Sequence, residues 1–263
     1  MNEEKKKNKI LIIIIIFMTI ALIFTIGYII HNINNETPEK NKIESNIKED
    51  TPNEKKELIY TKYKQNEFKN IYNIPYINIA SNKIDTINKE IDDYYKPIIT
   101  EMDKANNQNE DYYPTRKIDY EYSINKNILS IKITEYSESD GLTKTKTYNI
   151  DIDNKKSLSN SDLLQEKNIS EEEFINELRI KSKNKFVELY GTKEEWIKNE
   201  KDNGVIDVIE EEYDNALNNT LSNENININN PLFLNQNEKI NVIINIYQLA
   251  GPETNEYNII LNL

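Results

Sequence analysis

Histidine and cysteine, the side chains that most often supply a nucleophile, a proton shuttle or a transition-metal ligand, are almost absent from this chain of 263 residues. The only histidine is His31, and there is no cysteine. A Ser-His-Asp or Cys-His arrangement needs a histidine that exchanges a proton near neutral pH inside a folded site. His31 stands between a long apolar run and a polar segment, so we expect neither such an arrangement nor a histidine-based metal site.

Acidic residues are the remaining candidates for chemistry, because the chain has 45 aspartates and glutamates. The segment Asp151-x-Asp153-Asn154 starts like a calcium-binding loop. An EF-hand loop, however, needs an oxygen ligand at its fifth position and glycine at its sixth. Lys155 and Lys156 stand at those two positions. We therefore exclude an EF-hand and keep a loose surface calcium site as a minor alternative.

Runs of adjacent carboxylates occur at residues 171–173 and 210–212, both within expected helices. Neighbouring residues on a helix point to different faces, so these carboxylates do not converge on one point. Two carboxylates that act as acid and base must face each other across a substrate. We therefore interpret both runs as solvated helix faces, and we predict no catalytic residue, no cofactor and no metal.

Seventeen tyrosines offer aromatic faces that could contact a sugar or a protein. Tyr94 and Tyr95 belong to a helical stripe of apolar residues, and core packing needs at least one of them. Tyr112 and Tyr113 instead follow a polar segment of asparagine and glutamine residues. Exposed aromatic residues are enriched in recognition surfaces. The candidate ligand-binding residues are therefore Tyr112 and Tyr113.

Residues 10–30 form an uncharged apolar run, which decides how the rest of the chain is placed relative to a membrane. As a helix it spans about 31 Å, which matches the ~30 Å hydrocarbon core of a bilayer. Four lysines lie in the nine residues before it, whereas the residues after it carry almost no charge. The positive-inside rule then places residues 1–9 in the cytoplasm and the C-terminal domain outside the cell. No small-x-small cleavage site follows the run, so we predict an uncleaved signal anchor, with a cleaved signal peptide as the alternative.

The part of the chain after this run is acidic. Of the 33 Lys+Arg and 45 Asp+Glu residues, only four basic and two acidic ones precede residue 31, which leaves a net charge of −14 on residues 31–263. This charge argues against nucleic acid as a partner and favours either a basic partner or plain solubility. Residues 31–57 are polar, with two prolines and isolated isoleucines, so we expect a flexible stalk there.

The first half of the outer domain, residues 58–156, has the pattern of a sheet packed on a helix. Apolar residues recur every three or four positions from Asn82 to Lys104, which predicts a helix with Ser81 as its N-cap and a kink at Pro97. The expected strands lie at 58–64, 70–79, 116–124, 128–136 and 142–152, of which the last three form an antiparallel meander.

The second half, residues 157–263, has the pattern of helices followed by strands. Capping patterns at Ser170 and Thr192 predict two helices, and Gly191 ends the first of them. The resulting fold class is α+β, with one N-terminal transmembrane helix, a stalk, and an antiparallel meander packed with helices. The other expected elements are a helical turn at 161–164, a helix over 205–221 and strands at 225–234, 239–249 and 255–263.

Three segments of the outer domain resemble the RsiV-like/PdaC-like extracytoplasmic domain family, a domain of unknown function in Gram-positive bacteria. Tyr148–Leu164 is similar to the family's strand, turn and Leu-x-Leu-x-Asp-Leu-Phe run, with Asn154-Lys155-Lys156 in place of its Thr-Gly-Lys turn. Tyr72–Asn88 and Phe233–Leu263 are similar to its beginning and its end. The family's Gly-Gly-Ala-His signature is absent, because Ser139–Leu142 stands at that place.

The resemblance implies an outer domain that binds a basic, lysozyme-like protein. One family member adds a cytoplasmic sigma-binding domain and another a polysaccharide deacetylase domain, and we expect neither here. We expect instead a non-catalytic binding module of the cell membrane, with its N-terminus in the cytoplasm and a basic protein or peptidoglycan as its ligand. The alternatives are a wall hydrolase that uses two carboxylates, and a structural partner of a membrane complex.

Overall fold

The computed structural model describes residues 57–107, 115–204, 210–249 and 253–262. All of them belong to one compact unit, Lys55–Leu263. Strands and helices come in separate runs along the chain, as in an α+β fold, so the predicted fold class is confirmed for this unit. The predicted tail at 1–9 and membrane helix at 10–30 lie outside the described residues, as does almost all of the predicted stalk. Within the described ranges, no helix combines the length and the apolar character that a bilayer crossing needs.

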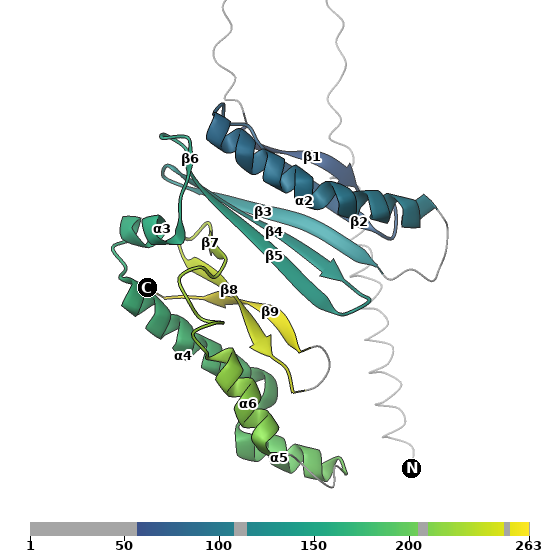
Figure 1. The fold of residues 1–263 in the computed structure, drawn as a ribbon, viewed down its shortest axis with the longest axis vertical. Coiled ribbons are helices and arrows are strands. Elements are labelled where there is room, and N and C mark those ends of the chain that lie inside the picture. The colour runs from purple at the N-terminus through teal and green to yellow at the C-terminus, as the bar shows by residue number, and fades with distance from the viewer. Residues whose placement is uncertain (1–56, 108–114, 205–209, 250–252, 263) are drawn as a thin grey trace, which may run out of the picture. The chain divides into compact units, whose positions relative to one another are not determined.

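The first sheet, among the described residues, has six strands that lie side by side in chain order (Figure 1). They are β1 (Ile59–Gln65), β2 (Ile71–Ile77), β3 (Arg116–Asn125), β4 (Ile128–Ser137), β5 (Leu142–Asp151) and β6 (Lys156–Ser157). Neighbouring strands are antiparallel except β2 and β3, which run parallel and pair over two residues of each strand. The predicted meander is confirmed as β3–β5.

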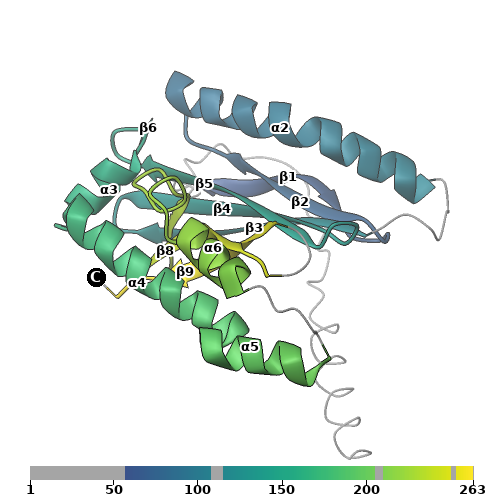
Figure 2. The same ribbon diagram turned by 60° about the horizontal axis from the view of Figure 1, so that its bottom comes forward.

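Helix α2 (Asn82–Asn107) covers one face of this sheet, as Figure 2 shows. Pro97 lies inside the helix, which continues beyond it. Asn88 is buried with the apolar stripe, and its side chain bonds both the N–H and the C=O of Ile77 on β2 at 2.9 Å. These bonds tie the helix to the end of β2. The buried stripe is confirmed and contains Ile84, Ile87, Ile91, Tyr95, Ile99 and Met102.

Two of the helices after the meander start where capping was predicted, directly after Ser170 and Thr192. The described ones are α3 (Asn160–Glu166), α4 (Glu171–Tyr190), α5 (Lys193–Asp202) and α6 (Glu210–Thr220), and residues 205–209 of the last predicted helix lie outside the described residues. Thr192 forms a reciprocal capping box with Glu195, and the Ser170 side chain accepts a hydrogen bond from the Glu173 N–H. Gly191 ends α4 with a φ of 78°, a conformation that glycine adopts at little cost.

A second sheet packs on the face of the meander opposite α2 (Figure 2). Its strands are β7 (Leu232–Leu234), β8 (Ile240–Tyr247) and β9 (Thr254–Ile260), and α4 and α6 pack against it. Polar side chains of the meander bond the backbone of β7. Ser130 Oγ accepts from the Leu234 N–H at 2.9 Å, and Asn149 Nδ2 donates to the Leu232 C=O at 2.9 Å. The two sheets are therefore joined by specific hydrogen bonds as well as by apolar contacts.

The core has two parts, one for each side of the meander. One cluster lies between α2 and the first sheet and includes Ile131 and Ile133. The other gathers around the second sheet, α4 and α6, and includes Phe174 and Phe186. The predicted division of the outer domain into the halves 58–156 and 157–263 stays a prediction.

The predicted strand at 225–234 is wrong over most of its length, because only its last three residues form β7. The residues before them make turns and bends. The side chains of Asn225, Asn227 and Asn230 bond nearby backbone groups, for example Asn230 Nδ2 to the Asn225 C=O at 2.9 Å. Asparagine competes in this way with the hydrogen bonds of a strand, so the alternating isoleucines of this segment were misleading.

Candidate ligand pocket

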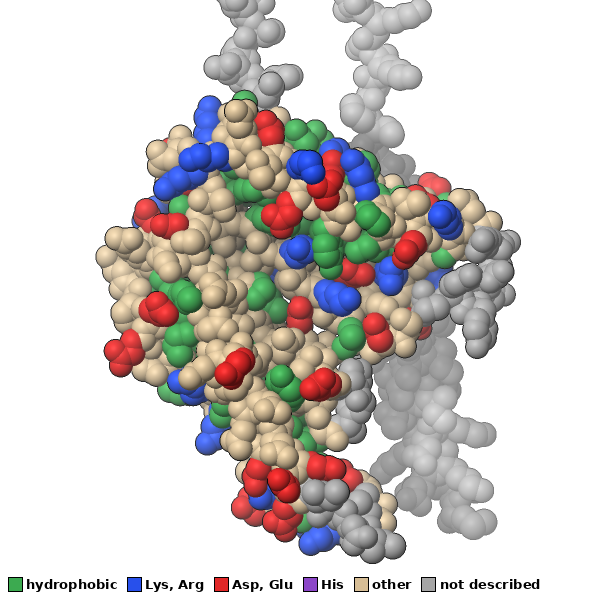
Figure 3. Space-filling view, in the orientation of Figure 1, with side chains coloured by type: hydrophobic (Ala, Val, Ile, Leu, Met, Phe, Trp, Pro, Cys, Tyr) green, Lys and Arg blue, Asp and Glu red, His purple; other side chains and the backbone are tan. Residues whose placement is uncertain are grey.

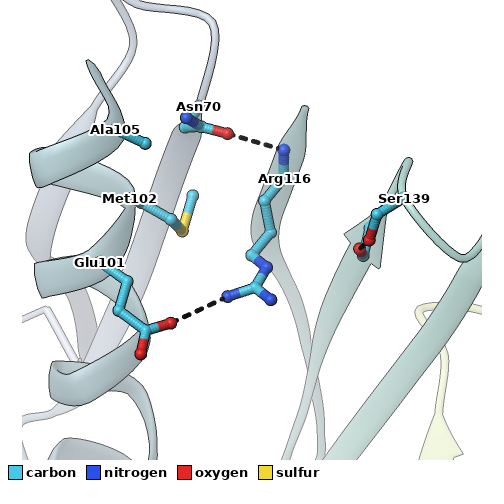
Figure 4. Close-up of a pocket in the computed structure, with 7 residues that line it drawn as sticks. Asn70, Glu101, Met102, Ala105, Arg116 and Ser139 are labelled. Atoms are coloured by element: carbon cyan, nitrogen blue, oxygen red, sulfur yellow. Dashed lines mark hydrogen bonds and ion pairs between the residues drawn. The ribbon is translucent and has the colours of Figure 1, made fainter. Parts of the chain in front are cut away.

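A pocket of about 310 Å³ opens between the C-terminal part of α2 and the adjoining ends of β3 and β4 (Figure 4). Met102 and Ala105 line it from the helix with apolar side chains. Arg116, the first residue of β3, extends its guanidinium group toward Glu101 on the helix (Figure 4). The pocket thus combines an apolar wall with charges of both signs. The remaining lining residues are Asn70, Ser137 and Ser139.

The register of β3 and β4 decides which side chains share this pocket. Arg116 lies opposite Ser137, and two residues further along the strands Ile118 lies opposite Glu135. Side chains two residues apart on a strand point to the same face of the sheet. Glu135 therefore lies on the same face of the sheet as the pocket. It is the next residue of β4 on that face after Ser137. The backbone N–H of Arg116 donates to Asn70 Oδ1 at 2.8 Å, which fixes the start of β3.

The Arg116 side chain is held loosely. Its Nη1 lies 3.6 Å from Glu101 Oε2, and its Nε lies 3.7 Å from Glu135 Oε1. Hydrogen bonds between a guanidinium and a carboxylate are normally ~2.7–2.9 Å long. Among the described residues, Arg116 therefore has two ion pairs but no close side-chain hydrogen bond, and its side chain is 34% exposed.

Glu135 is an unusual residue for the covered face of a sheet. Its side chain is 8% exposed, and its Oε2 has no hydrogen-bond partner within the part of the chain that the structure describes. A buried polar atom without a partner costs roughly 1–3 kcal/mol, and more if it is charged. Proteins keep such groups where a function, a water or a ligand accounts for them. Glu135 does not line the pocket itself, but it contacts Arg116, which does, and it is therefore a candidate binding group behind that side chain.

A second buried carboxylate belongs to Glu256 of β9, in the second sheet. Burial raises its pKa, and a hydrogen bond to Thr145 on β5 opposes this shift. Its Oε2 also lacks a partner among the described residues. The pKa of Tyr94 is raised by burial first and then by the charges of Glu135 and Glu256, whereas Arg116 lowers it. Both carboxylates therefore act on the pKa of Tyr94, although Glu135 lies in the first sheet and Glu256 in the second.

The predicted ligand-binding residues Tyr112 and Tyr113 lie outside the described residues, so their role stays a prediction. For the other tyrosine pair, the structure agrees with the sequence. Tyr95 is buried in the core with 1% of its surface exposed, and Tyr94 is 36% exposed. Core packing therefore takes one member of this pair and leaves the other at the surface.

Sequence reasoning missed Arg116 and Glu135, although a signal for them was present. In β4 the buried alternation of Ile131 and Ile133 continues into Glu135. A carboxylate in phase with two buried isoleucines is costly unless it has a partner or a task. Extending the predicted β3–β4 hairpin to its far end would have placed Arg116 beside this carboxylate.

The segment Asp151–Asn154 forms a closed turn. The Asp151 carboxylate accepts hydrogen bonds from the side chain of Asn154 at 2.6 Å and from its backbone N–H at 3.0 Å, and these bonds lower the pKa of Asp151. In the described ranges, no three His, Asp or Glu side chains are placed to hold a metal ion together. The expectations of no metal and no cofactor stay predictions, because part of the chain lies outside these ranges.

No protein-family model and no curated protein matches the chain. Among solved structures, the chain is similar to a crystal structure of a member of the DUF3298 family from Bacteroides fragilis. The two chains share 14% sequence identity with a TM-score of 0.34, over 77% of this chain and 89% of that one. This likeness is distant. The resemblance to the RsiV-like/PdaC-like family therefore stays a prediction.

Proposed function

We propose that the chain is a non-catalytic binding module on the outside of the cell, which recognises a basic protein or a wall glycan. The observation that carries this proposal is the buried carboxylate of Glu135, whose Oε2 has no partner among the described residues. Glu101 and Glu135 both form ion pairs with Arg116, so this cluster has two carboxylates and one guanidinium group among the described residues. A cationic group of a partner would both satisfy the free oxygen and neutralise the excess charge.

The charge of the whole outer domain supports a basic protein over a neutral glycan. Acidic side chains gather over α5 and α6 at one end of the described unit (Figure 3). A field of this sign attracts a basic partner before contact, raises the association rate, and weakens as salt screens it. The acidic surface would thus deliver a basic partner to the pocket, where the specific contact forms.

We propose residues 10–30 as the membrane anchor of this module, with residues 1–9 in the cytoplasm and 31–57 as its stalk. The uncharged run and the lysines before it support this placement. Membership of the RsiV-like/PdaC-like family is part of the same proposal and rests on the sequence motifs. Recovery of the full-length chain from lysed cells in the aqueous fraction without detergent would contradict the anchor.

A wall hydrolase that uses two carboxylates is the second candidate. Glu135 and Glu256 favour it, because both are buried carboxylates and a raised pKa, as at Glu256, suits a general acid. The free oxygens of both residues, however, are closed to solvent. Among the described residues, Arg116 connects Glu135 to the pocket, whereas no residue that lines the pocket has an ion pair with Glu256. A hydrolase needs both carboxylates at the substrate, so binding is the better supported function.

A retention experiment on the compact unit Lys55–Leu263, which has its own core, tests the proposal. We expect the immobilised unit to retain lysozyme, as a basic protein, or purified wall polymer at low salt. Replacing Glu101→Gln and Glu135→Gln together should weaken retention of lysozyme severalfold. The matched control changes two exposed glutamates of α4, Glu171→Gln and Glu172→Gln, and should leave retention nearly unchanged.

Two outcomes would decide against binding as the function. If neither lysozyme nor wall polymer is retained at low salt, the module does not recognise either ligand class. If sugars are released from the wall polymer during incubation, the hydrolase is the correct assignment.

A further inference from the structure

We infer that the pocket is a slot for one cationic side chain, which Arg116 of this chain fills in the free state. A basic partner enters the slot with a lysine of its own and displaces the Arg116 side chain. This inference rests on the proposed function and names the group that the partner must supply. Three observations support it: the contacts that hold Arg116, the missing hydrogen bond of Glu135 Oε2 among the described residues, and the volume and lining of the pocket.

Only the side chain of Arg116 is free to leave. The Arg116 N–H donates to Asn70 Oδ1, and Asn70 is held by Asn106 of α2 through bonds of 3.1 and 3.0 Å. The start of β3 therefore stays in place. The guanidinium group, by contrast, is partly exposed and lies 3.6 Å or more from both of its carboxylate partners. Its departure breaks two long ion pairs and moves no backbone.

Glu135 needs a cation in this slot. A buried carboxylate that loses its only close positive partner is strongly destabilised. Arg116 provides that charge from 3.7 Å but leaves Oε2 without a hydrogen bond from the described residues. A lysine ammonium is compact and has three donors that rotate freely. Placed between Glu101 and Glu135, it can form charge-assisted bonds of ~2.7–2.9 Å, shorter than the present contacts.

The pocket has room for a lysine stem. Met102 and Ala105 form its apolar side on α2, within a volume of about 310 Å³ (Figure 4). Lysine buries its methylene groups along apolar surface and keeps its ammonium group with polar partners. On the sheet side, the hydroxyls of Ser137 and Ser139 are bonded to each other at 2.9 Å and have further acceptor capacity.

In an alternative role, Arg116 binds an anionic ligand directly. The two roles predict different effects of removing Arg116 on the binding of a cation. An arginine that fills the slot competes with the partner, so its removal strengthens the binding of a cation. An arginine that binds an anion stabilises the complex with that anion and does not compete with a cation. Two carboxylates beside a single guanidinium also disfavour a further negative charge.

The test measures the affinity of a hexalysine peptide for the unit Lys55–Leu263 by calorimetry at low salt. We expect Arg116→Ala to bind roughly fivefold more tightly than the wild type, and Glu135→Gln roughly fivefold more weakly. Two exposed helix positions provide controls with the same charge changes, Lys198→Ala on α5 and Glu172→Gln on α4. Each control should stay within about twofold of the wild type.

The slot does not exist if Arg116→Ala binds no better than Lys198→Ala, or if Glu135→Gln binds no worse than Glu172→Gln. Because Arg116→Ala can fail to fold, a second measurement uses the wild type. The NMR signal of the Arg116 Nε–H group should shift as peptide is added, and an unchanged signal overturns the inference. If these measurements are negative but the unit still retains lysozyme or wall polymer, this inference is wrong and the proposed function is unaffected.

Discussion

Glu135 and Glu256 are two buried carboxylates with different surroundings. Glu135 has a guanidinium at 3.7 Å, which offsets part of the cost of burying its charge. Glu256 has the hydrogen bond to Thr145, and the more distant charge of Lys144 adds a smaller compensation, so burial still raises its pKa. The raised pKa of Glu256 predicts that this group makes the stability of the unit depend on pH.

For Glu256 the sign of that dependence follows from the raised pKa. The folded state holds the proton more tightly than the unfolded state, whose carboxyl titrates near ~4.3. Below that pH both states are protonated and the group has no effect, whereas stability is lost as pH rises through the folded pKa. We expect Glu256→Gln to melt at a higher temperature than the wild type near pH 7 and at the same temperature near pH 4.

Thermal unfolding of the unit at the two pH values checks this expectation. Glutamine keeps an acceptor for the Thr145 bond, so the variant removes mainly the charge. The control is Glu224→Gln, an exposed position. A difference between Glu256→Gln and the wild type that is equal at both pH values would show that titration of Glu256 does not contribute.

At the scale of elements, local signals predicted the helices and the meander. The apolar stripe of α2, the capping residues Ser170 and Thr192 and the two hairpin turns act between neighbours in sequence. The position of the second sheet depends on polar side chains of the meander, which bond backbone groups about 80 to 110 residues away in the sequence. No local sequence pattern predicts such pairs. The strand predicted at 225–234 is mostly absent for a related reason. Asparagine side chains, instead of a neighbouring strand, bond the backbone carbonyl groups there.

The junction between the two sheets supports a prediction about Ser130. Its side chain is fully buried, and its Oγ both accepts from the Leu234 N–H and donates to Asn149 Oδ1. Ser130→Ala leaves the Leu234 N–H without this partner in the core, which should lower the free energy of unfolding by about 1–3 kcal/mol. Urea unfolding of the unit measures the change.

Ser161→Ala is the control for this variant, because Ser161 is an exposed residue of α3. It should change the free energy of unfolding by less than about 0.5 kcal/mol. Equal stabilities of Ser130→Ala and Ser161→Ala would mean that the hydrogen bonds between the sheets add nothing to the apolar packing.

At the scale of the whole molecule, the composition determines the net charge, from which we predicted a basic partner, whereas the pocket required the fold. Arg116 and Glu101 are separated in sequence by the residues between α2 and β3, and only the packing of α2 on the sheet brings them together. A charged residue in a strand pattern indicates a possible site, but the identity of its neighbour depends on register and on helix placement. Tyr112 and Tyr113 lie outside the described residues, so their role in ligand binding stays a prediction from the sequence.

The most direct test of the central claim is the footprint of a basic partner on the unit Lys55–Leu263. Backbone amide exchange is measured for the unit alone and with lysozyme in excess at low salt. The pocket predicts slower exchange at the start of β3, the end of β4 and the C-terminal part of α2. Protection confined to α4, α5 and α6, with the pocket elements unchanged, would show that the acidic surface attracts the partner while the pocket takes no part in binding.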